Sequence, residues 1–123
     1  MTGRVKLYFD GGWRPATGME IAVVVRGETR ITRDLRQGSS MAAEWLALIE
    51  ALRTARAMVL EDFVLLGDSR AVIDQATGRV PSRGANAHHR ATFCALAGEM
   101  PRIRHIARAQ NLAGIALAAL HPR

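Results

Sequence analysis

Three acidic residues occupy positions from which they could hold a metal ion. Asp10 ends an apolar stretch before two glycines, Glu44 lies near the start of a predicted helix, and Asp68 follows a second apolar stretch. Carboxylates that converge repel one another, which raises at least one pKa unless a cation lies between them, and such hard oxygen ligands select Mg²⁺ or Mn²⁺. The three acids therefore predict a divalent-metal site. Each one taken alone also fits an ordinary role as turn former or helix cap.

The first third of the chain predicts three antiparallel strands. Apolar and polar residues alternate over 5–10, which indicates a strand that ends at Asp10, where Gly11-Gly12 breaks it. Two further strands are predicted over 19–26 and 29–35, joined by a tight turn. These strands form the first part of the scaffold that must position Asp10.

The middle of the chain predicts a helix, a buried strand and a second helix. Large apolar residues recur at helical intervals over 41–58, after serine hydroxyls that can cap a helix. The run 63–67 is wholly apolar, which is typical of a parallel strand buried on both faces. Asp68 or Ser69 then caps a helix that extends to about Thr77.

The last part of the chain predicts a loop, a helix, a strand and a final helix. The segment 78–90 is rich in Gly, Pro and Arg, which indicates an exposed basic loop, and the helix after it ends at Pro101. A strand is predicted over 102–108. An alanine-rich helix over 112–120 is apolar almost all round, which predicts burial on more than one side.

This order of elements predicts an α/β fold in which helices cover both faces of a mixed five-stranded sheet. Asp10 and Asp68 each close a strand, so their carboxylates are expected to converge beyond one edge of the sheet, where open sheets bind ligands. Glu44 lies in the first turns of its helix, where free N–H groups and the helix dipole favour a carboxylate.

Length and composition predict a single domain over 1–123, because 123 residues with 49% apolar content support one sizeable core. No apolar run approaches the roughly 20 residues of a membrane span, and the first residues lack the apolar segment of a secretory signal, so a cytoplasmic location is expected. A single cysteine, Cys94, excludes an internal disulfide. The apolar last helix leaves a monomer and a homodimer both open.

The net charge of +6 comes almost entirely from arginine, since Lys6 is the only lysine. Arginine suits bidentate phosphate contacts, although a coding bias toward arginine gives the same composition. From Arg79 onward Glu99 is the only acidic residue among seven arginines, so one part of the molecule is strongly cationic. A nucleic-acid partner is therefore expected, with a merely solvated basic face as the alternative.

These segments together resemble the ribonuclease H family, with its ribonuclease H-like fold, over nearly the whole chain. The resemblance is carried by five stretches: VKLYFDGG, RPATGMEIAVVV, AAEWLALIEAL, VLLGDSRAVID and IRHIARAQNLAGIALA. They look like the family's first strand with its catalytic Asp, its turn and second strand, its catalytic-Glu helix, its strand-Asp-Ser-helix and its last strand, loop and helix. Arg108 and Asn111 match the family's Arg-x-x-Asn pattern.

The resemblance implies catalytic and metal-binding roles for Asp10, Glu44 and Asp68, with Asp10 between two cations of Mg²⁺ or Mn²⁺. It also implies contacts with nucleic acid near these acids, to which the arginines in and next to the basic loop are added. The expected contact residues are Gly11, Gly12, Ser40, Ser69, Arg79, Arg83, Arg90, Arg108 and Asn111. His88 and His89, in the predicted loop, are candidates for proton transfer or simply solvated side chains.

The sequence departs from the family's pattern at two places. The last helix normally brings a fourth carboxylate, and here Ile115 stands at its position, with no Asp or Glu anywhere after Glu99. Isoleucine cannot ligate a metal, so the second cation of a two-metal site would lose a protein ligand. Before Glu44 the family often has Asn residues that touch the hybrid's minor groove, whereas this chain has Ser40-Met41.

The sequence therefore favours an endonuclease that hydrolyses phosphodiester bonds with a divalent metal, its expected substrate being the RNA strand of an RNA–DNA hybrid. The missing carboxylate keeps a second hypothesis open, in which the chain is a ribonuclease H-like nucleic-acid-binding module with weak or no activity. A third is a related nuclease acting on other structured RNA or DNA, because Ser40-Met41 weakens the case for reading 2′-hydroxyl groups.

Overall fold

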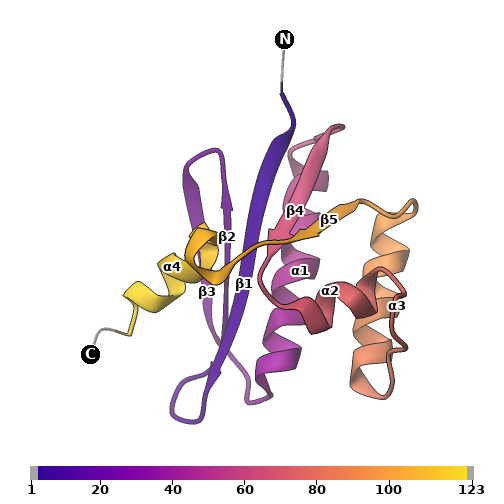
Figure 1. Ribbon diagram of the computed structural model, residues 1–123. Coiled ribbons are helices and arrows are strands. Elements are labelled where there is room, and N and C mark those ends of the chain that lie inside the picture. Colours follow the sequence, from indigo (N-terminus) through magenta and orange to yellow (C-terminus); the bar gives the residue numbers. More distant parts are fainter. Residues whose placement is uncertain (1–2, 122–123) are drawn as a thin grey trace.

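A computed structural model describes residues 3–121 of the protein (Figure 1). The strands of its single sheet are β1 (Val5–Arg14), β2 (Gly18–Val25), β3 (Glu28–Leu35), β4 (Phe63–Gly67) and β5 (Arg102–His105). The helices are α1 (Ser40–Ala57), α2 (Arg70–Ala76), α3 (Ala85–Ala97), the short 3₁₀ turn η1 (Arg108–Gln110) and α4 (Leu112–Ala119). The predicted order of strands and helices is confirmed.

The sheet has the strand order β3-β2-β1-β4-β5 and is mixed. β1, β2 and β3 pair antiparallel, β4 pairs parallel with β1, and β5 pairs parallel with β4. Each of the two parallel pairs requires a crossover connection, which the helices between the strands provide. The predicted α/β fold with a mixed five-stranded sheet is therefore confirmed.

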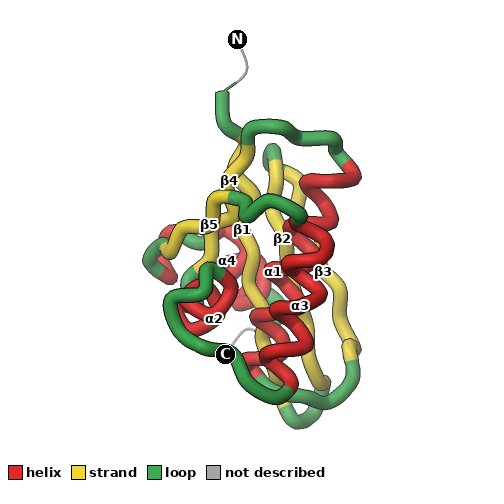
Figure 2. Tube along the Cα trace, turned by 90° about the vertical axis from the view of Figure 1, so that its right-hand side faces the viewer, coloured by secondary structure: helices red, strands yellow, loops and turns green. Residues whose placement is uncertain are grey.

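Helices cover both faces of the sheet, as predicted. On one face Leu7 and Phe9 of β1 pack with Trp45 and Leu48 of α1, all at most 1% exposed, and α3 packs beside α1 (Figure 2). On the other face α4 packs on β1 and β2 through Ala113 and Leu117, the latter 5% exposed (Figure 1). Successive side chains of β1 thus contribute to two separate hydrophobic clusters, one on each face of the sheet.

β1 does not end at Asp10, contrary to the sequence prediction. The strand continues to Arg14, and Gly11 and Gly12 pair with Ile21 and Glu20 of β2. Gly11 is required for a close approach instead of a turn, because a Cβ atom there would lie 2.1 Å from the carbonyl oxygen of Ala43 in α1. Asp10 is therefore held inside a long strand against the start of α1.

Two boundaries in the second half of the chain also differ from the prediction. α3 begins at Ala85, so His88 and His89 lie on a helix and not in the basic loop. It ends before Pro101, since Gly98 with φ of +67° already terminates it. β5 stops at His105, which leaves Arg108 in η1 and not in a strand.

α4 is less buried than its apolar sequence predicts. Leu112 and Ile115 are 46% and 53% exposed, so the helix packs on the sheet along one side only, and the prediction of burial on more than one side is wrong. Across residues 3–121, no helix combines the length and the apolar character that crossing a bilayer requires.

Candidate metal centre

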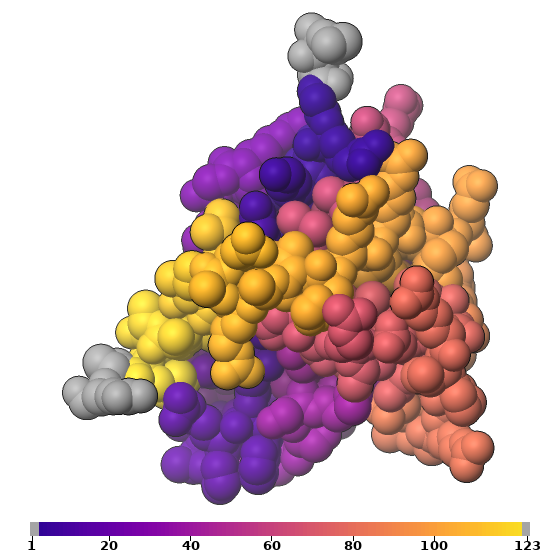
Figure 3. Space-filling model, viewed as in Figure 1, coloured from indigo at the N-terminus to yellow at the C-terminus, as the bar shows by residue number. Residues whose placement is uncertain are grey.

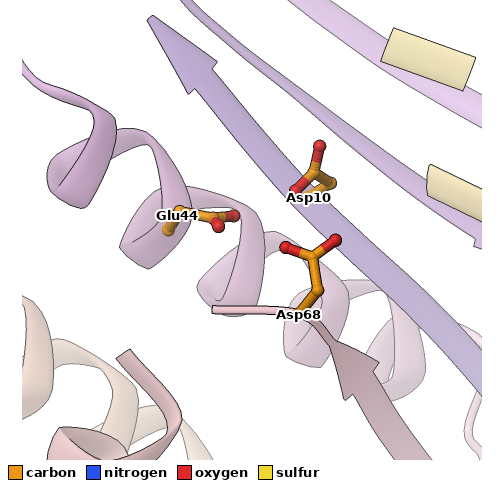
Figure 4. A group of neighbouring side chains, drawn as sticks. All are labelled: Asp10, Glu44 and Asp68. Atoms are coloured by element: carbon orange, nitrogen blue, oxygen red, sulfur yellow. The ribbon is translucent and has the colours of Figure 1, made fainter. Parts of the chain in front are cut away.

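Asp10 and Asp68 are brought together by the parallel pairing of β1 and β4. The register pairs Tyr8 with Leu66; Asp10 lies two residues further along β1, on the same face as Tyr8, and Asp68 directly follows the last residue of β4. In Figure 4 the two carboxyl groups point toward one another from the end of β4 and the middle of β1. The predicted convergence of these two acids is therefore observed.

Glu44 joins the pair from the second turn of α1. The backbone N–H of Gly11 donates to Glu44 Oε1 at 2.7 Å, which ties the helix to β1 beside Asp10 (Figure 4). Oxygen atoms of Asp10, Glu44 and Asp68, one from each residue, all lie within 4.8 Å of one another. The three predicted ligands thus meet at one point, where α1 can come close because residue 11 has no side chain.

The proximity and burial of the acids raise the pKa values of Glu44 and Asp10. Burial first, and then the negative charge of Asp10, raise the pKa of Glu44 from an ordinary 4.5 to about 8. Burial and then the charge of Asp68 raise the pKa of Asp10 from 3.8 to about 6, while Arg108 acts in the opposite direction. A hydrogen bond between the carboxyl groups of Asp10 and Glu44 lowers the pKa of Asp10 and raises that of Glu44.

This donor set fits a divalent cation. Oxygen ligands within 4.8 Å of one another suit the coordination distances of Mg²⁺ and Mn²⁺, and a cation between them would remove the repulsion that raises their pKa values. Binding would displace the proton held by Glu44, so metal affinity is expected to increase with pH. Asp10, Glu44 and Asp68 are the residues that would hold the ion.

Replacing Glu44 by Gln is expected to stabilise the metal-free protein at pH 8. A raised carboxyl pKa means that the folded state binds a proton that the unfolded chain has released, so the free energy of unfolding falls as pH rises from about 4.5 to about 8. Gln keeps the acceptor for the Gly11 N–H without the charge. We expect Glu44→Gln to gain about 1–3 kcal/mol at pH 8 in EDTA and little at pH 5.

Thermal unfolding at both pH values, with EDTA and with Mg²⁺, measures this effect. Mg²⁺ should raise the Tm of the wild type more than that of Glu44→Gln, because only the wild type has the third carboxylate. Equal melting curves of the two proteins at pH 8 in EDTA would contradict the proposed repulsion.

Asn111 supports the site from behind and is not itself accessible. Its side chain is fully buried, and its Nδ2 donates to Phe9 O and to Asp68 Oδ2, each at 3.0 Å. Its Oδ1 accepts from the N–H of Ala113 and so caps α4. The expected contact of this side chain with nucleic acid is therefore corrected: Asn111 orients Asp68 and joins β1 to α4.

Four other predicted contact residues lie around the acids. Gly11, Gly12, Ser40 and the exposed Arg108 line a cavity of about 590 Å³ that also contains the three carboxylates. Ser69 caps α2 by accepting from Val72 N at 3.4 Å, so its hydroxyl has a structural partner beside Asp68. The positive charge of Arg108 lowers the pKa of Asp10, against the larger effects that raise it.

The remaining predicted residues do not line this cavity. Arg79 and Arg83 are exposed in the segment between α2 and α3, and Arg90 donates to Gln75 O at 2.9 Å. His88 is exposed on α3, while the ring of His89 stacks on Trp45, 6.2 Å between centroids. Burial, and then the charge of His88, lower the pKa of His89. The structure brings neither histidine to the acids.

The cavity wall also contains an ion pair that the sequence did not predict. Glu20 of β2 is 4% exposed, accepts from His121 Nε2 at 2.5 Å, and lies 3.4 Å from Arg33 Nε. Glu20 and His121 both line the cavity. The signal in the sequence was one acidic residue inside the otherwise apolar stretch of β2. This pair fastens the end of α4 to the sheet.

α4 contributes a glycine to the acidic cluster. A Cβ atom on Gly114 would lie 3.4 Å from Asp10 Oδ2 and 3.6 Å from Asp68 Oδ2, whereas Ile115 is half exposed and does not line the cavity. The described residues thus place only Asp10, Glu44 and Asp68 in the cluster, and no fourth acid joins them.

Comparison with known proteins agrees with this fold. Residues 9–121 match the model of the family described as reverse transcriptase-like. RNase H1 from Halobacterium salinarum NRC-1 is 29% identical, with a TM-score of 0.82 over 94% of each chain. LC11-RNase H1, isolated from compost by a metagenomic approach and solved in complex with an RNA/DNA hybrid, is 22% identical, with a TM-score of 0.80 over 93% of each chain.

A third similar structure is the N-terminal RNase H domain of Rv2228c from Mycobacterium tuberculosis, at 22% identity and a TM-score of 0.73, covering 98% of this chain and all of the other. Comparison with curated protein sequences gave no match. The family match spans most of the chain, so the protein belongs to this reverse transcriptase-like family, whose fold is ribonuclease H-like.

Proposed function

We propose that the protein is a metal-dependent endonuclease that hydrolyses the RNA strand of RNA–DNA hybrids. The observation that carries the proposal is that oxygen atoms of Asp10, Glu44 and Asp68 meet within 4.8 Å of one another in a cavity of about 590 Å³. A structural neighbour, LC11-RNase H1, was solved with an RNA/DNA hybrid, which supports this substrate.

Several residues of the cavity, together with the buried Asn111, have a chemical role in this proposal. A divalent cation held by the three acids supplies Lewis-acid polarisation of a phosphoryl oxygen and an activated water. Arg108 offers a guanidinium to the substrate's phosphates from the cavity wall. Ser40, exposed at the start of α1, offers a hydroxyl to the hybrid's minor groove. Asn111 holds Asp68 in place from beneath.

A nucleic-acid-binding module with weak or no activity is the second candidate. It is favoured by α4, where Gly114 lies beside the acids and Ile115 stands at the position of the family's fourth carboxylate, because neither residue can ligate a metal. Under this alternative the protein binds the hybrid and leaves it intact.

Cleavage of labelled duplexes distinguishes these functions. Hybrid, double-stranded RNA and double-stranded DNA are incubated with the protein and Mg²⁺ or Mn²⁺, and the products are separated by length. The proposal predicts cleavage of the RNA strand of the hybrid only, and none in EDTA. Binding without cleavage would support the module, and equal cleavage of another duplex would support a related nuclease with a different substrate.

Replacing Ile115 by Asp tests whether the absent carboxylate limits the site. We expect Ile115→Asp to lower the Mg²⁺ concentration for half-maximal cleavage by about tenfold, the size of effect typical of groups around metal ligands. Leu112→Asp is a matched control, since it is similarly exposed, lies on the same helix and adds the same charge. Equal effects of the two substitutions would show that only net charge matters.

A further inference from the structure

Part of the sheet face that carries α4 has no helix over it in the described chain. α4 packs on β1 and β2 (Figure 1), and beside it the first half of β1 together with β4 and β5 is reached from the surface (Figure 3). The registers pair Tyr8 with Leu66 and Leu66 with Arg104, which sets these three side chains in one row across the strands.

Two adjoining hollows follow this open face, with volumes of about 430 and 500 Å³. Arg4, Lys6 and Tyr8 line both hollows, Arg26 lines the smaller one and Arg104 the larger one. We call these two hollows the cationic groove, because four basic side chains and no acidic side chain line it. The field of the groove therefore attracts anions.

The positive charge of the groove is largely unneutralised. Within residues 3–121, Lys6, Arg26 and Arg104 are exposed and have no ion-pair partner, and Arg4 pairs with the exposed Asp62 at 3.1 Å. By contrast Arg30 and Arg53, elsewhere on the surface, each pair with a glutamate. A row of free cations along a groove fits an extended polyanion.

Tyr8 indicates which polyanion fits. Its half-buried side chain lines both hollows together with the basic residues, and its hydroxyl makes no hydrogen bond within the described residues. Single strands bind in grooves that combine cations with aromatic rings, because every base offers a face for stacking. A duplex keeps its bases stacked inside, and an acidic peptide has none, so neither would use this ring.

The groove is separate from the carboxylate cavity, although both lie on one face of the sheet. The strap from β5 to α4 crosses β4 and β1 between them (Figure 1) and is fixed by bonds from Ile106 N to Gly67 O and from Asn111 to Phe9 O. Arg108 of the strap lines the cavity, and Gln110 lines the groove. We propose that the cationic groove binds a single-stranded segment of nucleic acid, independently of metal.

Fluorescence anisotropy of a labelled oligothymidylate of about 12 nucleotides, within the known range of single-strand sites, tests this proposal in EDTA, where the carboxylates hold no cation. The double variant Lys6→Gln/Arg104→Gln should bind at least about tenfold more weakly at low salt. The slope of log affinity against log salt should decrease by about 1.4, or about 0.7 for each lost phosphate contact. Tyr8→Leu should weaken binding about fivefold or more without changing this slope.

The control is Arg30→Gln/Arg53→Gln, which removes the same charge outside the groove and should change affinity less than threefold. Circular dichroism is used to check that the variants are folded. All of the substitutions except Tyr8→Leu are at exposed positions. An equal loss of affinity for the oligothymidylate in both double variants would overturn the proposal. So would polyglutamate that displaces the labelled oligonucleotide as well as unlabelled oligonucleotide does. The single-strand assignment would be overturned if Lys6→Gln/Arg104→Gln weakened the binding of a blunt-ended duplex as much as it weakened the binding of the single strand. None of these outcomes depends on hydrolysis, so the proposed nuclease activity is tested separately.

Discussion

Asp10→Asn is expected to lower the rate of hybrid cleavage by about 10³-fold or more. A carboxylate oxygen of Asp10 lies within 4.8 Å of oxygens of both Glu44 and Asp68, so the substitution removes one of the three ligands of the cluster. A bound cation contributes several kcal/mol of charge stabilisation, and every 1.36 kcal/mol is a tenfold change in rate. Initial rates on labelled hybrid at saturating Mg²⁺ measure the loss.

The same substitution should not unfold the protein. Asn has the size of Asp without its charge, so in EDTA the variant is expected to be at least as stable as the wild type, because the repulsion with Asp68 is gone. Asp34→Asn is the control: it is an exposed acid of β3 with φ of +59°, a conformation that Asn tolerates. Activity that survives in Asp10→Asn, or is lost equally in Asp34→Asn, would contradict the assigned role.

Gly11→Ala is expected to destabilise the protein by about 3 kcal/mol or more. The added methyl group would lie 2.1 Å from Ala43 O and 2.6 Å from Glu44 N, and all of these contacts are with the backbone of α1. The helix would have to move away from β1, which would also stretch the Gly11–Glu44 hydrogen bond. Urea unfolding measures the change in the free energy of unfolding.

Gly12 provides the matched control one residue further along β1. A Cβ atom there would meet only Glu20 Cγ, at 4.0 Å, so Gly12→Ala should be neutral or stabilise the strand by up to about 1 kcal/mol. Similar losses in both variants would mean that the pair of glycines matters for strand flexibility and not for the approach of α1.

Local patterns in the sequence were sufficient for most of the fold. The alternation in β1, the apolar run of β4 and the helical spacing around Trp45 each reflect which side chains of one element are buried, and a short stretch of sequence is enough to show such a pattern. The positions of Asp10 and Asp68 followed from the same reasoning, since both residues come directly after apolar strand residues.

The features that the sequence did not reveal depend on contacts between distant segments. Gly11 looks like a strand breaker until α1 is placed beside it. Asn111 looks like a surface contact, but it is buried because two strands and a helix converge on its amide. The pairing of Glu20 with His121 spans 101 positions, and no local pattern connects these two residues.

Binding of Mn²⁺, followed by the loss of the free-ion electron paramagnetic resonance signal, tests the metal centre most directly. Titrations of the wild type and of Asp10→Asn at pH 8, where Glu44 releases its proton more readily than at lower pH, compare the intact and the broken cluster. We predict saturable binding of at least one ion to the wild type and at least about tenfold weaker binding to the variant. No saturable binding, or equal affinity in both proteins, would contradict a metal site formed by Asp10, Glu44 and Asp68.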